Sequence, residues 1–286
     1  MNAAAPRQLV LVVDFGAQYA QLIARRVREL KVYSEIVAHD ISADDVRERK
    51  PSAIILSGGP ASVHVENAPR LDPEIFELGV PILGICYGAQ LIAHQLGGVV
   101  GRNSQGEYGR TTLSSDSTNP SSLLGPDAPS SQTVWMSHFD GITVAPDGFI
   151  GCGSSPNAPI ALLESDERRI WGVQYHPEVG HTPSGMDLLG RFLHDLAGCE
   201  PTWTMDSVIE TSIDAVRAQV GPGRAICGLS GGVDSAVAAA LVHKAIGSRL
   251  TCVYVDTGLM RLNESEQVVE TFQRHQGIEL IHVRAG

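Results

Sequence analysis

Residues 82–90 read ILGICYGAQ, an apolar run that ends in a cysteine with a glycine on either side of it. A short buried strand, then a glycine-containing turn, then a helix, is the repeating unit of a parallel sheet with crossover helices. The same order recurs where Leu9–Val13 precedes Asp14-Phe15-Gly16 and where Ala53–Leu56 precedes Ser57-Gly58-Gly59-Pro60. We therefore predict an α/β fold, with ligands gathered at the carboxyl ends of the parallel strands.

The rest of the first domain has a different texture. Short alternating stretches between Gly101 and Ala161 predict antiparallel strands, with an exposed loop over Ser114–Ser131. Ile170–Tyr175 then predicts a strand that ends at His176-Pro177-Glu178. Met186–Leu196 predicts a closing helix.

A second α/β domain is predicted after a short connector. We assign residues 1–199 to the first domain, 200–206 to a linker and 207–286 to the second domain. The expected elements of the second domain are a helix over Ser207–Val220, strands at Ala225–Leu229, Leu250–Val255 and Leu280–Val283, a glycine turn over Ser230–Ser235 and a helix over Ala236–Ile246. About 80 residues are few for a complete nucleotide-binding sheet, so we expect a truncated domain.

Composition and charge exclude several classes of protein. With 43% hydrophobic and 19% charged residues, the 286-residue chain can bury a core, which excludes a disordered tail. The formal net charge of −11 repels phosphate backbones and anionic membranes, so we expect neither nucleic acid nor a membrane as partner. The five cysteines form no Cys-x-x-Cys pair, and no apolar run approaches the ~20 residues of a membrane span. We expect a cytoplasmic protein.

Cys86 is the first candidate catalytic residue. It lies between a predicted strand and a predicted helix, so we expect it on a sharp turn that lifts the sulfur out of the core. The N-terminus of the following helix favours the thiolate, which is the reactive species. The alternative is a buried, unreactive cysteine that packs as a small apolar residue. The flanking Gly84 and Gly88 favour the nucleophile.

His176 and Glu178 are candidate partners for this thiol. They follow a strand whose end can meet Cys86 across the sheet. His176 would take and return the proton, and Glu178 would orient the imidazole and stabilise its charged form. A His-Pro-Glu turn is also ordinary surface sequence. The segment Ser57-Gly58-Gly59-Pro60 adds a third part, because adjacent glycines let backbone N–H groups approach a developing oxyanion, although it also suits a plain tight turn.

Together these segments resemble the class I, triad-type glutamine amidotransferases. Ser137-His138-Phe139-Asp140 is similar to the glutamine-binding segment of that family, with Phe139 in place of the glycine expected there. The resemblance implies a flavodoxin-like domain with a central, mostly parallel sheet. It implies that Cys86 is the nucleophile, that His176 and Glu178 are its partners, that Gly59 and Tyr87 are oxyanion-hole donors, and that Gln90, Ser137, His138 and Asp140 contact glutamine.

A second chemical signature is Ser230-Gly231-Gly232-Val233-Asp234-Ser235. Between a strand and a helix, its backbone N–H groups and the helix dipole form an anion site suited to phosphate, although a glycine turn capped by Ser235 fits the same spacing. No lysine follows the glycines, so this is not the Gly-x-x-x-x-Gly-Lys loop of other ATPases. Asp234 repels phosphate, which suggests that it helps to hold a Mg²⁺ ion that bridges phosphate oxygens.

The hexapeptide resembles the pyrophosphate-binding loop of ATP pyrophosphatases, which cleave ATP between the α and β phosphates. The resemblance implies an incomplete Rossmann-like domain of that kind. Residues 254–261 are similar to the following strand and turn of the GMP synthase branch, where the strand end borders the adenine pocket. The residues implied to bind ATP or its pyrophosphate are Ser230, Gly231, Gly232, Val233, Asp234, Ser235 and Val255, with Asp234 also at the metal.

An amidotransferase domain followed by this loop resembles the family of glutamine-hydrolysing GMP synthases. The resemblance implies a ligase of purine biosynthesis that hydrolyses glutamine to glutamate and ammonia. The enzyme would use ATP to adenylylate XMP, which releases pyrophosphate. Ammonia would then convert the adenylylated XMP to GMP, which releases AMP. ATP is then a substrate that carries Mg²⁺, and no tightly bound organic cofactor is expected. A homodimer is expected for the full-length protein, through a region missing here. The alternative is a truncated nucleotide-binding or regulatory module, or a glutaminase only, without synthase activity.

Overall fold

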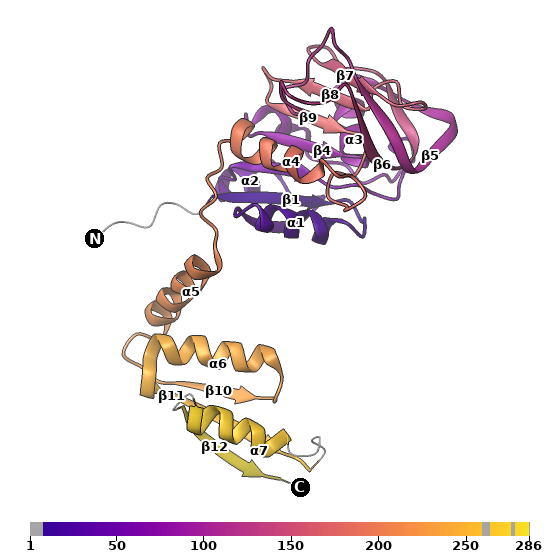
Figure 1. Cartoon of the computed structure of the whole chain (residues 1–286). Helices are drawn as coiled ribbons and strands as arrows, with labels where there is room; N and C mark the ends of the chain where they lie inside the picture. The colour runs from indigo at the N-terminus through magenta and orange to yellow at the C-terminus, as the bar shows by residue number, and fades with distance from the viewer. Residues whose placement is uncertain (1–7, 259–263, 276–277, 286) are drawn as a thin grey trace. The chain divides into compact units, whose positions relative to one another are not determined.

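The computed structural model describes residues 8–258, 264–275 and 278–285 (Figure 1). The chain divides into two compact units, Met1–Trp203 and Thr204–Gly286. Within the described ranges, no helix combines the length and the apolar character that crossing a membrane requires.

The first unit is built on one mixed sheet. Its strands are β1 (Leu9–Asp14), β2 (Tyr33–Ala38), β3 (Ala53–Leu56), β4 (Ile82–Ile85), β5 (Val99–Ser115), β6 (Ser131–Val144), β7 (Ile150–Ser154), β8 (Leu162–Ser165) and β9 (Ile170–Val173). They lie in the order β2-β1-β3-β4-β9-β8-β7-β5-β6. Strands β2, β1, β3, β4 and β9 are parallel, whereas β8, β7, β5 and β6 are joined by antiparallel pairings. The predicted α/β fold with a mostly parallel centre is confirmed.

Helices cover both faces of this sheet. They are α1 (Ala20–Glu29), α2 (Ala43–Arg49), the 3₁₀ turn η1 (Pro73–Glu77), α3 (Tyr87–Gln95), α4 (Gly185–Gly190) and the π-helical turn η2 (Arg191–Leu196). Val10 and Val12 of β1 pack in one apolar cluster with α1 and α4, while Leu11 and Val13 pack in the other with α2 and α3. This double burial is why the central strands are continuous apolar runs rather than alternating ones.

Three predictions for the first unit are corrected. The segment Ser114–Ser131 is not a simple exposed loop, because Leu123 is buried in the core and Glu164 accepts hydrogen bonds from Ser121 and Ser122. The strand predicted to reach Tyr175 ends at Val173, because its pairing with β4 ends at Ile85 and its pairing with β8 ends at Leu162. The predicted closing helix becomes π-helical from Arg191 onward.

The second unit contains a small parallel sheet. Its strands are β10 (Ala225–Leu229), β11 (Leu250–Asp256) and β12 (Glu279–Arg284), in that spatial order. Its helical segments are α5 (Met205–Val220), α6 (Val233–Ile246), η3 (Gly247–Arg249), α7 (Glu264–Val269) and η4 (Glu270–His275). Helix α6 begins at Val233 rather than at the predicted Ala236, because Gly232 has the extended backbone of an N-cap residue. The second half of the predicted glycine turn is therefore helical.

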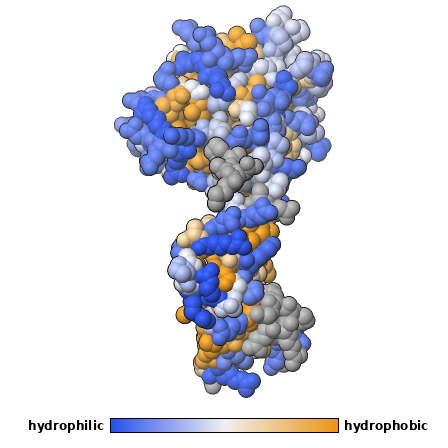
Figure 2. Space-filling model, turned by 90° about the vertical axis from the view of Figure 1, so that its left-hand side faces the viewer, coloured by the Kyte–Doolittle hydropathy of each residue, from blue (hydrophilic) through white to orange (hydrophobic). Residues whose placement is uncertain are grey.

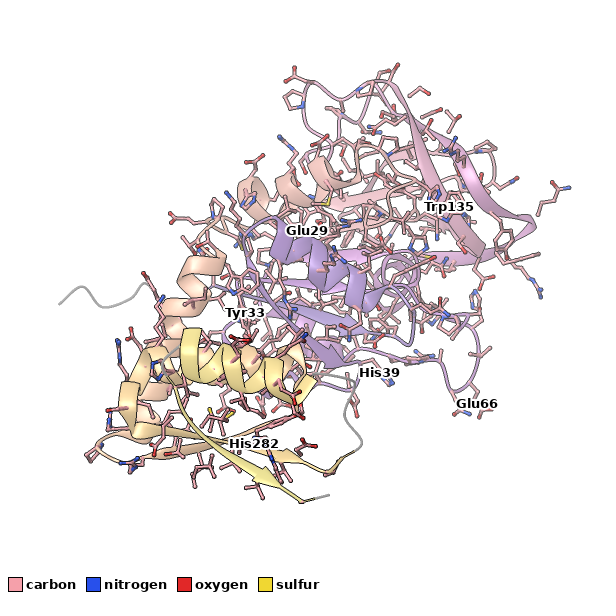
Figure 3. The ribbon with its side chains drawn as sticks, turned by 60° about the horizontal axis from the view of Figure 1, so that its bottom comes forward. Glu29, Tyr33, His39, Glu66, Trp135 and His282 are labelled. Atoms are coloured by element: carbon pink, nitrogen blue, oxygen red, sulfur yellow. The ribbon has the colours of Figure 1, made fainter. Side chains whose placement is uncertain are left out.

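The helices of the second unit pack on one face of this sheet. Leu229, Cys252 and Leu280 point into that cluster. The alternating residues Ile226, Val255 and Ile281 are exposed on the other face. Figure 2 shows apolar surface on this unit. His282 of β12 is labelled in Figure 3. The sheet of the second unit is thus covered on one side only within the described residues.

Candidate active site

Cys86 occupies a strained turn between β4 and α3. Its φ of 52° and ψ of −104° lie outside the regions that non-glycine residues normally adopt. Its N–H donates to the Val173 carbonyl at 2.8 Å, which ties the turn to the end of β9. Such a strand–turn–helix elbow places a side chain at the carboxyl edge of the sheet. The expectation that the turn lifts the sulfur out of the core is wrong, because Cys86 is buried and belongs to the apolar cluster that contains Val10 and Val12. The residue nevertheless lines a cavity, so it is not enclosed on all sides.

The two glycines around Cys86 are required by close packing. A Cβ atom at Gly88 would lie 2.5 Å from the Leu56 carbonyl oxygen, and one at Gly84 would lie 2.6 Å from Ile92 Cδ1. Helix α3 therefore passes directly against β3 and β4, and only glycine fits at the contact. The sequence pattern that predicted the turn has this steric cause.

His176 and Glu178 meet Cys86 at this edge. The Nδ1–H group of His176 donates to Glu178 Oε1 at 2.8 Å, and both side chains are buried. A Cβ at Gly58 would lie 3.3 Å from His176 Cε1 and 3.8 Å from Cys86 Cβ, so the thiol and the imidazole flank the same glycine. The structure brings these three predicted residues together.

The backbone around His176 is held from several directions. Its N–H donates to the carbonyl of Trp135 on β6, which Figure 3 labels, and its carbonyl accepts from Thr182 Oγ1 at 2.7 Å. The Tyr19 ring meets the imidazole edge to face at 5.4 Å between centroids. The imidazole is therefore preorganised, which an acid–base residue requires.

The charge of His176 follows from its surroundings. Burial by itself would lower the pKa of His176, but hydrogen bonds and charge interactions with Cys86 and Glu178 outweigh burial and raise the pKa to about 10. The ring is thus held protonated at neutral pH. A protonated imidazole is the partner that stabilises a cysteine thiolate.

The predicted oxyanion donors lie beside the elbow. Tyr87 is the first residue of α3, where N–H groups lack a partner within the helix. A Cβ at Gly59 would lie 3.2 Å from Tyr87 Cγ, so the two residues are neighbours. Ser57 fixes the glycine loop, since its Oγ accepts from Phe15 N–H and donates to the Gly58 carbonyl. Two backbone donors on adjacent rigid segments suit a developing oxyanion.

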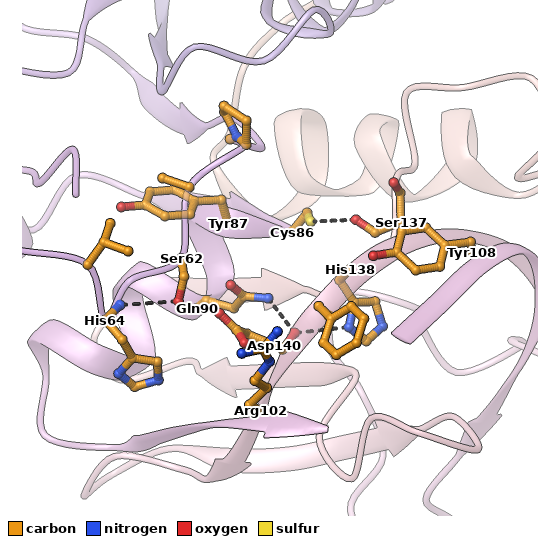
Figure 4. A pocket seen from close by; sticks show the side chains of 15 residues that line it. Ser62, His64, Cys86, Tyr87, Gln90, Arg102, Tyr108, Ser137, His138 and Asp140 are labelled. Atoms are coloured by element: carbon orange, nitrogen blue, oxygen red, sulfur yellow. Dashed lines mark hydrogen bonds between the residues drawn. The ribbon is translucent and has the colours of Figure 1, made fainter. Parts of the chain in front are cut away.

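A cavity of about 620 Å³ opens at Cys86 (Figure 4). Its lining includes the predicted glutamine-binding residues Gln90, Ser137, His138 and Asp140. Gln90 Nε2 donates to the Asp140 carbonyl at 2.7 Å, and Cys86 Sγ lies 3.7 Å from the Ser137 carbonyl oxygen. The cavity is large enough for an amino acid and has Cys86 on its wall.

Two buried residues of this region were missed by the sequence analysis. Gln174 accepts from Gln90 Nε2 at 3.2 Å and donates to Cys86 Sγ at 3.7 Å. Glu107 lies 3.1 Å from His138 Nε2. The only sequence signal that could have indicated Gln174 is its position two residues before His176. The pairing of Glu107 with His138 depends on strand register, which the sequence pattern does not reveal.

Phe139 lies at the rim of the cavity. The Arg102 guanidinium lies over its ring, 5.1 Å from the centroid. A Cβ at Gly106 would lie 3.0 Å from Phe139 Cδ2, so the glycine at position 106 leaves room for the phenyl ring. The departure from glycine at 139 is therefore accommodated by the facing strand.

The predicted phosphate loop lies at the end of β10. Ser230 N–H donates to Ser235 Oγ at 3.2 Å, and Ser235 Oγ donates to the Gly232 carbonyl at 3.0 Å. Gly231 has a φ of 80°, which favours glycine. These bonds fold the loop over the N-terminus of α6 with its backbone exposed, which suits an anion.

Asp234 and Val255 lie at the ends of elements near this loop. Asp234 is in the first turn of α6, and Val255 is near the end of β11. No group of three or more His, Cys, Asp or Glu side chains that could hold a metal occurs in the part of the chain that the structure describes. A single carboxylate fits Mg²⁺ that arrives with phosphate oxygens, because that ion keeps several of its waters. Residues 259–261, also singled out in the sequence, lie outside the described residues.

Two known protein families match parts of this chain. Residues 11–196 match the family Glutamine amidotransferase class-I. Residues 207–282 match the family NAD synthase, which supports the resemblance of the second domain to ATP pyrophosphatases.

Curated relatives resemble the chain along nearly its whole length. A protein of Parafrankia sp. named GMP synthase [glutamine-hydrolyzing] is 56% identical over 276 residues, which are 96% of this chain and 51% of the relative. A protein of Heliobacterium modesticaldum with the same name is 53% identical over 284 residues, 99% of this chain and 54% of the relative. The chain spans about half the length of the curated relatives it matches.

Solved structures resemble the first unit. A putative GMP synthase subunit from Thermoplasma acidophilum is 31% identical with a TM-score of 0.60, covering 68% of this chain and 96% of the other. A glutamine amidotransferase from Thermotoga maritima, 18% identical with a TM-score of 0.53 over 68% of this chain and 99% of the other, shares the fold.

Proposed function

Because the chain belongs to the class-I glutamine amidotransferase family, we propose that it serves glutamine-dependent GMP synthesis, with glutamine hydrolysis in the first unit and ATP use in the second. The observation that carries this proposal is the strained Cys86 elbow beside the hydrogen-bonded pair His176–Glu178. The relatives named GMP synthase favour this activity over a nucleotide-binding module alone.

Glutamine hydrolysis begins with attack by Cys86. The thiolate adds to the side-chain amide carbon, and the N–H groups of Gly59 and Tyr87 stabilise the resulting oxyanion. His176, protonated in the resting site, gives its proton to the departing nitrogen, which leaves as ammonia. A glutamyl thioester on Cys86 remains.

Water then releases glutamate. The imidazole of His176, now neutral, takes a proton from water as the oxygen attacks the thioester. Collapse of the second tetrahedral intermediate expels the Cys86 thiolate and restores the starting pair. Glu178 stabilises the imidazolium at both stages and keeps Nδ1 protonated, so that Nε2 faces the reacting groups.

The cavity residues hold the substrate. Gln90, Ser137, His138 and Asp140 are proposed to contact glutamine, because they line the cavity that opens at Cys86. Gln90 directs its Nε2 group to the protein, which leaves its carbonyl oxygen as an acceptor.

The second unit is proposed to use ATP. The loop Ser230–Ser235 would bind the pyrophosphate through backbone N–H groups, with Asp234 at Mg²⁺ and Val255 beside the base. The activated group is the C2 oxygen of XMP, which leaves as AMP when ammonia attacks. We propose that residues 200–206 are the linker between the domains, which the division of the chain into compact units after Trp203 supports. We also propose that the full-length enzyme is a homodimer.

A glutaminase assay with an ATP-binding measurement tests this function. We expect the chain to release glutamate from glutamine and to bind ATP, and we expect Cys86→Ala to abolish glutamate release while leaving ATP binding intact. In a full-length protein, Cys86→Ala should retain GMP synthesis from ammonia. Glutamate release by Cys86→Ala would refute the nucleophile, and ATP binding without any glutamate release by the parent chain would favour the module.

A further inference from the structure

A buried carboxyl–imidazole pair lies behind the wall of the cavity at Cys86. Glu107 of β5 and His138 of β6 are direct partners in the antiparallel register. Their side chains are 4% and 1% exposed, and Glu107 Oε2 lies 3.1 Å from His138 Nε2. A carboxylate and an imidazole this deeply buried are retained only when their polar atoms are satisfied.

Both ring nitrogens of His138 face oxygen atoms that accept hydrogen bonds. Nδ1 lies 2.9 Å from the Asp140 carbonyl oxygen, and Nε2 lies 3.1 Å from the Glu107 carboxylate. A carbonyl oxygen and an ionised carboxylate cannot donate. With Glu107 ionised, both nitrogens carry protons and the ring is an imidazolium.

The surroundings of Glu107 favour its ionised form. Besides His138, Ser155 Oγ donates to Oε2 at 2.6 Å and Asn157 N–H donates to Oε1 at 3.1 Å. The same Ser155 oxygen accepts from Ala158 N–H at 3.1 Å, which holds the hydroxyl beside Glu107. Three donors converge on the carboxylate, which is how an ionised buried acid is stabilised.

A chain of hydrogen bonds connects this pair to the nucleophile. The Asp140 carbonyl accepts from His138 Nδ1 and from Gln90 Nε2. Gln90 Nε2 also donates to Gln174 Oε1, and Gln174 Nε2 donates to Cys86 Sγ. Every step in this chain has a fixed donor and a fixed acceptor, because the Asp140 carbonyl oxygen can only accept.

We propose that Glu107 is a positioning residue that keeps His138 doubly protonated, and that the ion pair fixes the Asp140 carbonyl against which Gln90 is aligned in the cavity. This inference rests on the proposed hydrolysis of glutamine at Cys86. It limits the proposed contact of His138 with glutamine to the backbone and the ring carbons, because both ring nitrogens are already hydrogen-bonded within the protein. The other ionisable side chains that line the cavity are His64, Cys86, Tyr87, Arg102, Tyr108 and Asp140.

The protonation state is tested by NMR of the chain with ¹⁵N-labelled histidine. We expect both ring nitrogens of His138, assigned by their loss in His138→Gln, to show the chemical shifts of protonated nitrogen from pH 6 to pH 9. In Glu107→Gln, one of them should show the shift of an unprotonated nitrogen at the alkaline end. An unprotonated ring nitrogen at neutral pH in the parent chain would overturn the proposal.

Kinetics of glutamine hydrolysis test the positioning role. In Glu107→Gln we expect KM for glutamine to rise about tenfold, because the negative charge that strengthens this buried hydrogen bond is lost, with a smaller change in kcat. We also expect kcat/KM to fall toward alkaline pH as the unsupported ring loses a proton, in contrast to the parent chain. A parent-like KM and pH profile in this variant would refute the role.

Glu164→Gln is the matched control. Glu164 is equally buried and bound by serine hydroxyls and backbone N–H groups of Ser122 and Leu123, but no histidine among the described residues hydrogen-bonds to it. The Glu164→Gln variant should lose stability as Glu107→Gln does, but it should keep the KM and the pH profile of the parent chain. If Glu164→Gln showed both kinetic changes, the effect of Glu107 would be one of stability alone. A doubly protonated His138 in a chain without glutaminase activity would contradict only the proposed function, and a neutral His138 in an active chain would contradict only this inference.

Discussion

The two units place their candidate sites at the same point of the same local structure, yet the sites differ in burial. In the first unit β4 turns into α3 at Cys86, and in the second β10 turns into α6 through the loop Ser230–Gly232. Cys86 is only 5% exposed and is held by neighbours on both sides, whereas the loop in the second unit is exposed. A strand–turn–helix unit thus yields a preorganised nucleophile where its sheet is covered on both faces, and an open anion site where the described residues leave one face bare.

This difference has a chemical reason. The proposed covalent catalysis by Cys86 needs a sulfur and an imidazole fixed to within a fraction of an ångström, which close packing supplies. Binding of pyrophosphate needs several N–H groups and a helix dipole, which an exposed loop already offers. The first site is expected to be far less tolerant of added atoms than the second.

The largest effect is expected for Gly88→Ala in the first unit. The new Cβ would lie 2.5 Å from the Leu56 carbonyl oxygen, and backbone cannot move aside as a side chain can. We expect a loss of about 3 kcal/mol in the free energy of unfolding, at the upper end of the cost of overpacking, and loss of glutaminase activity. Urea unfolding followed by tryptophan fluorescence measures it, since all three tryptophans lie in the first unit.

Gly228→Ala on β10 is the matched substitution in the second unit. A Cβ there would have no neighbour within 4 Å among the described residues, so we expect the stability to change by less than about 0.5 kcal/mol. Equal losses at Gly88 and Gly228 would contradict the contrast in packing.

These glycines also show what the sequence could reveal. The turns at Cys86, Gly59 and Ser230 were predictable because an apolar run followed by glycine has one common structural meaning. The approach of His176 to Cys86 followed from both being placed at strand ends of one parallel sheet.

Other features could not be predicted, because they depend on register and on long-range packing. Glu107 meets His138 only through the pairing of β5 with β6, which contains an irregularity just before Glu107. The burial of Leu123 and the start of α6 at Val233 depend likewise on tertiary contacts and on the backbone of Gly232. Local pattern identified the candidate catalytic residues and missed features that depend on contacts between distant parts of the chain.

The pH dependence of stability should differ between the two units. His176 has a pKa raised from 6.5 to about 10 in the folded chain, so its stabilising contribution is complete below pH 6.5 and is lost as pH rises toward 10. In the second unit the pKa of Asp256 is lowered from 3.8, first by the hydrogen bond from Gly258 N–H and then by Ser265. Its contribution is therefore present above pH 3.8 and is lost as the pH falls below that value.

Tryptophan-detected unfolding between pH 6.5 and pH 10 measures the alkaline loss in the first unit. We expect a slope of at most about 1.4 kcal/mol per pH unit, the value for one proton. His176→Asn should flatten this slope, whereas His181→Asn should keep it, because His181 is exposed and only stacks on Trp135. A slope that survives in His176→Asn would assign the alkaline loss to another group.

The smallest effect is expected at the bare face of the second sheet. Ile226 on β10 is 80% exposed, while Leu229 on the same strand is 7% exposed and packs in the core of that unit. Ile226→Thr keeps a β-branched side chain and removes few contacts, so we expect a change within about 0.5 kcal/mol, whereas Leu229→Thr should cost about 3 kcal/mol through a cavity and a buried hydroxyl. Amide hydrogen exchange of β11 reads the stability of this unit without a tryptophan. A cost at Ile226 as large as that at Leu229 would mean that the face is covered in solution, for example by association of two chains, and the dependence of the exchange rates on protein concentration would then reveal that association.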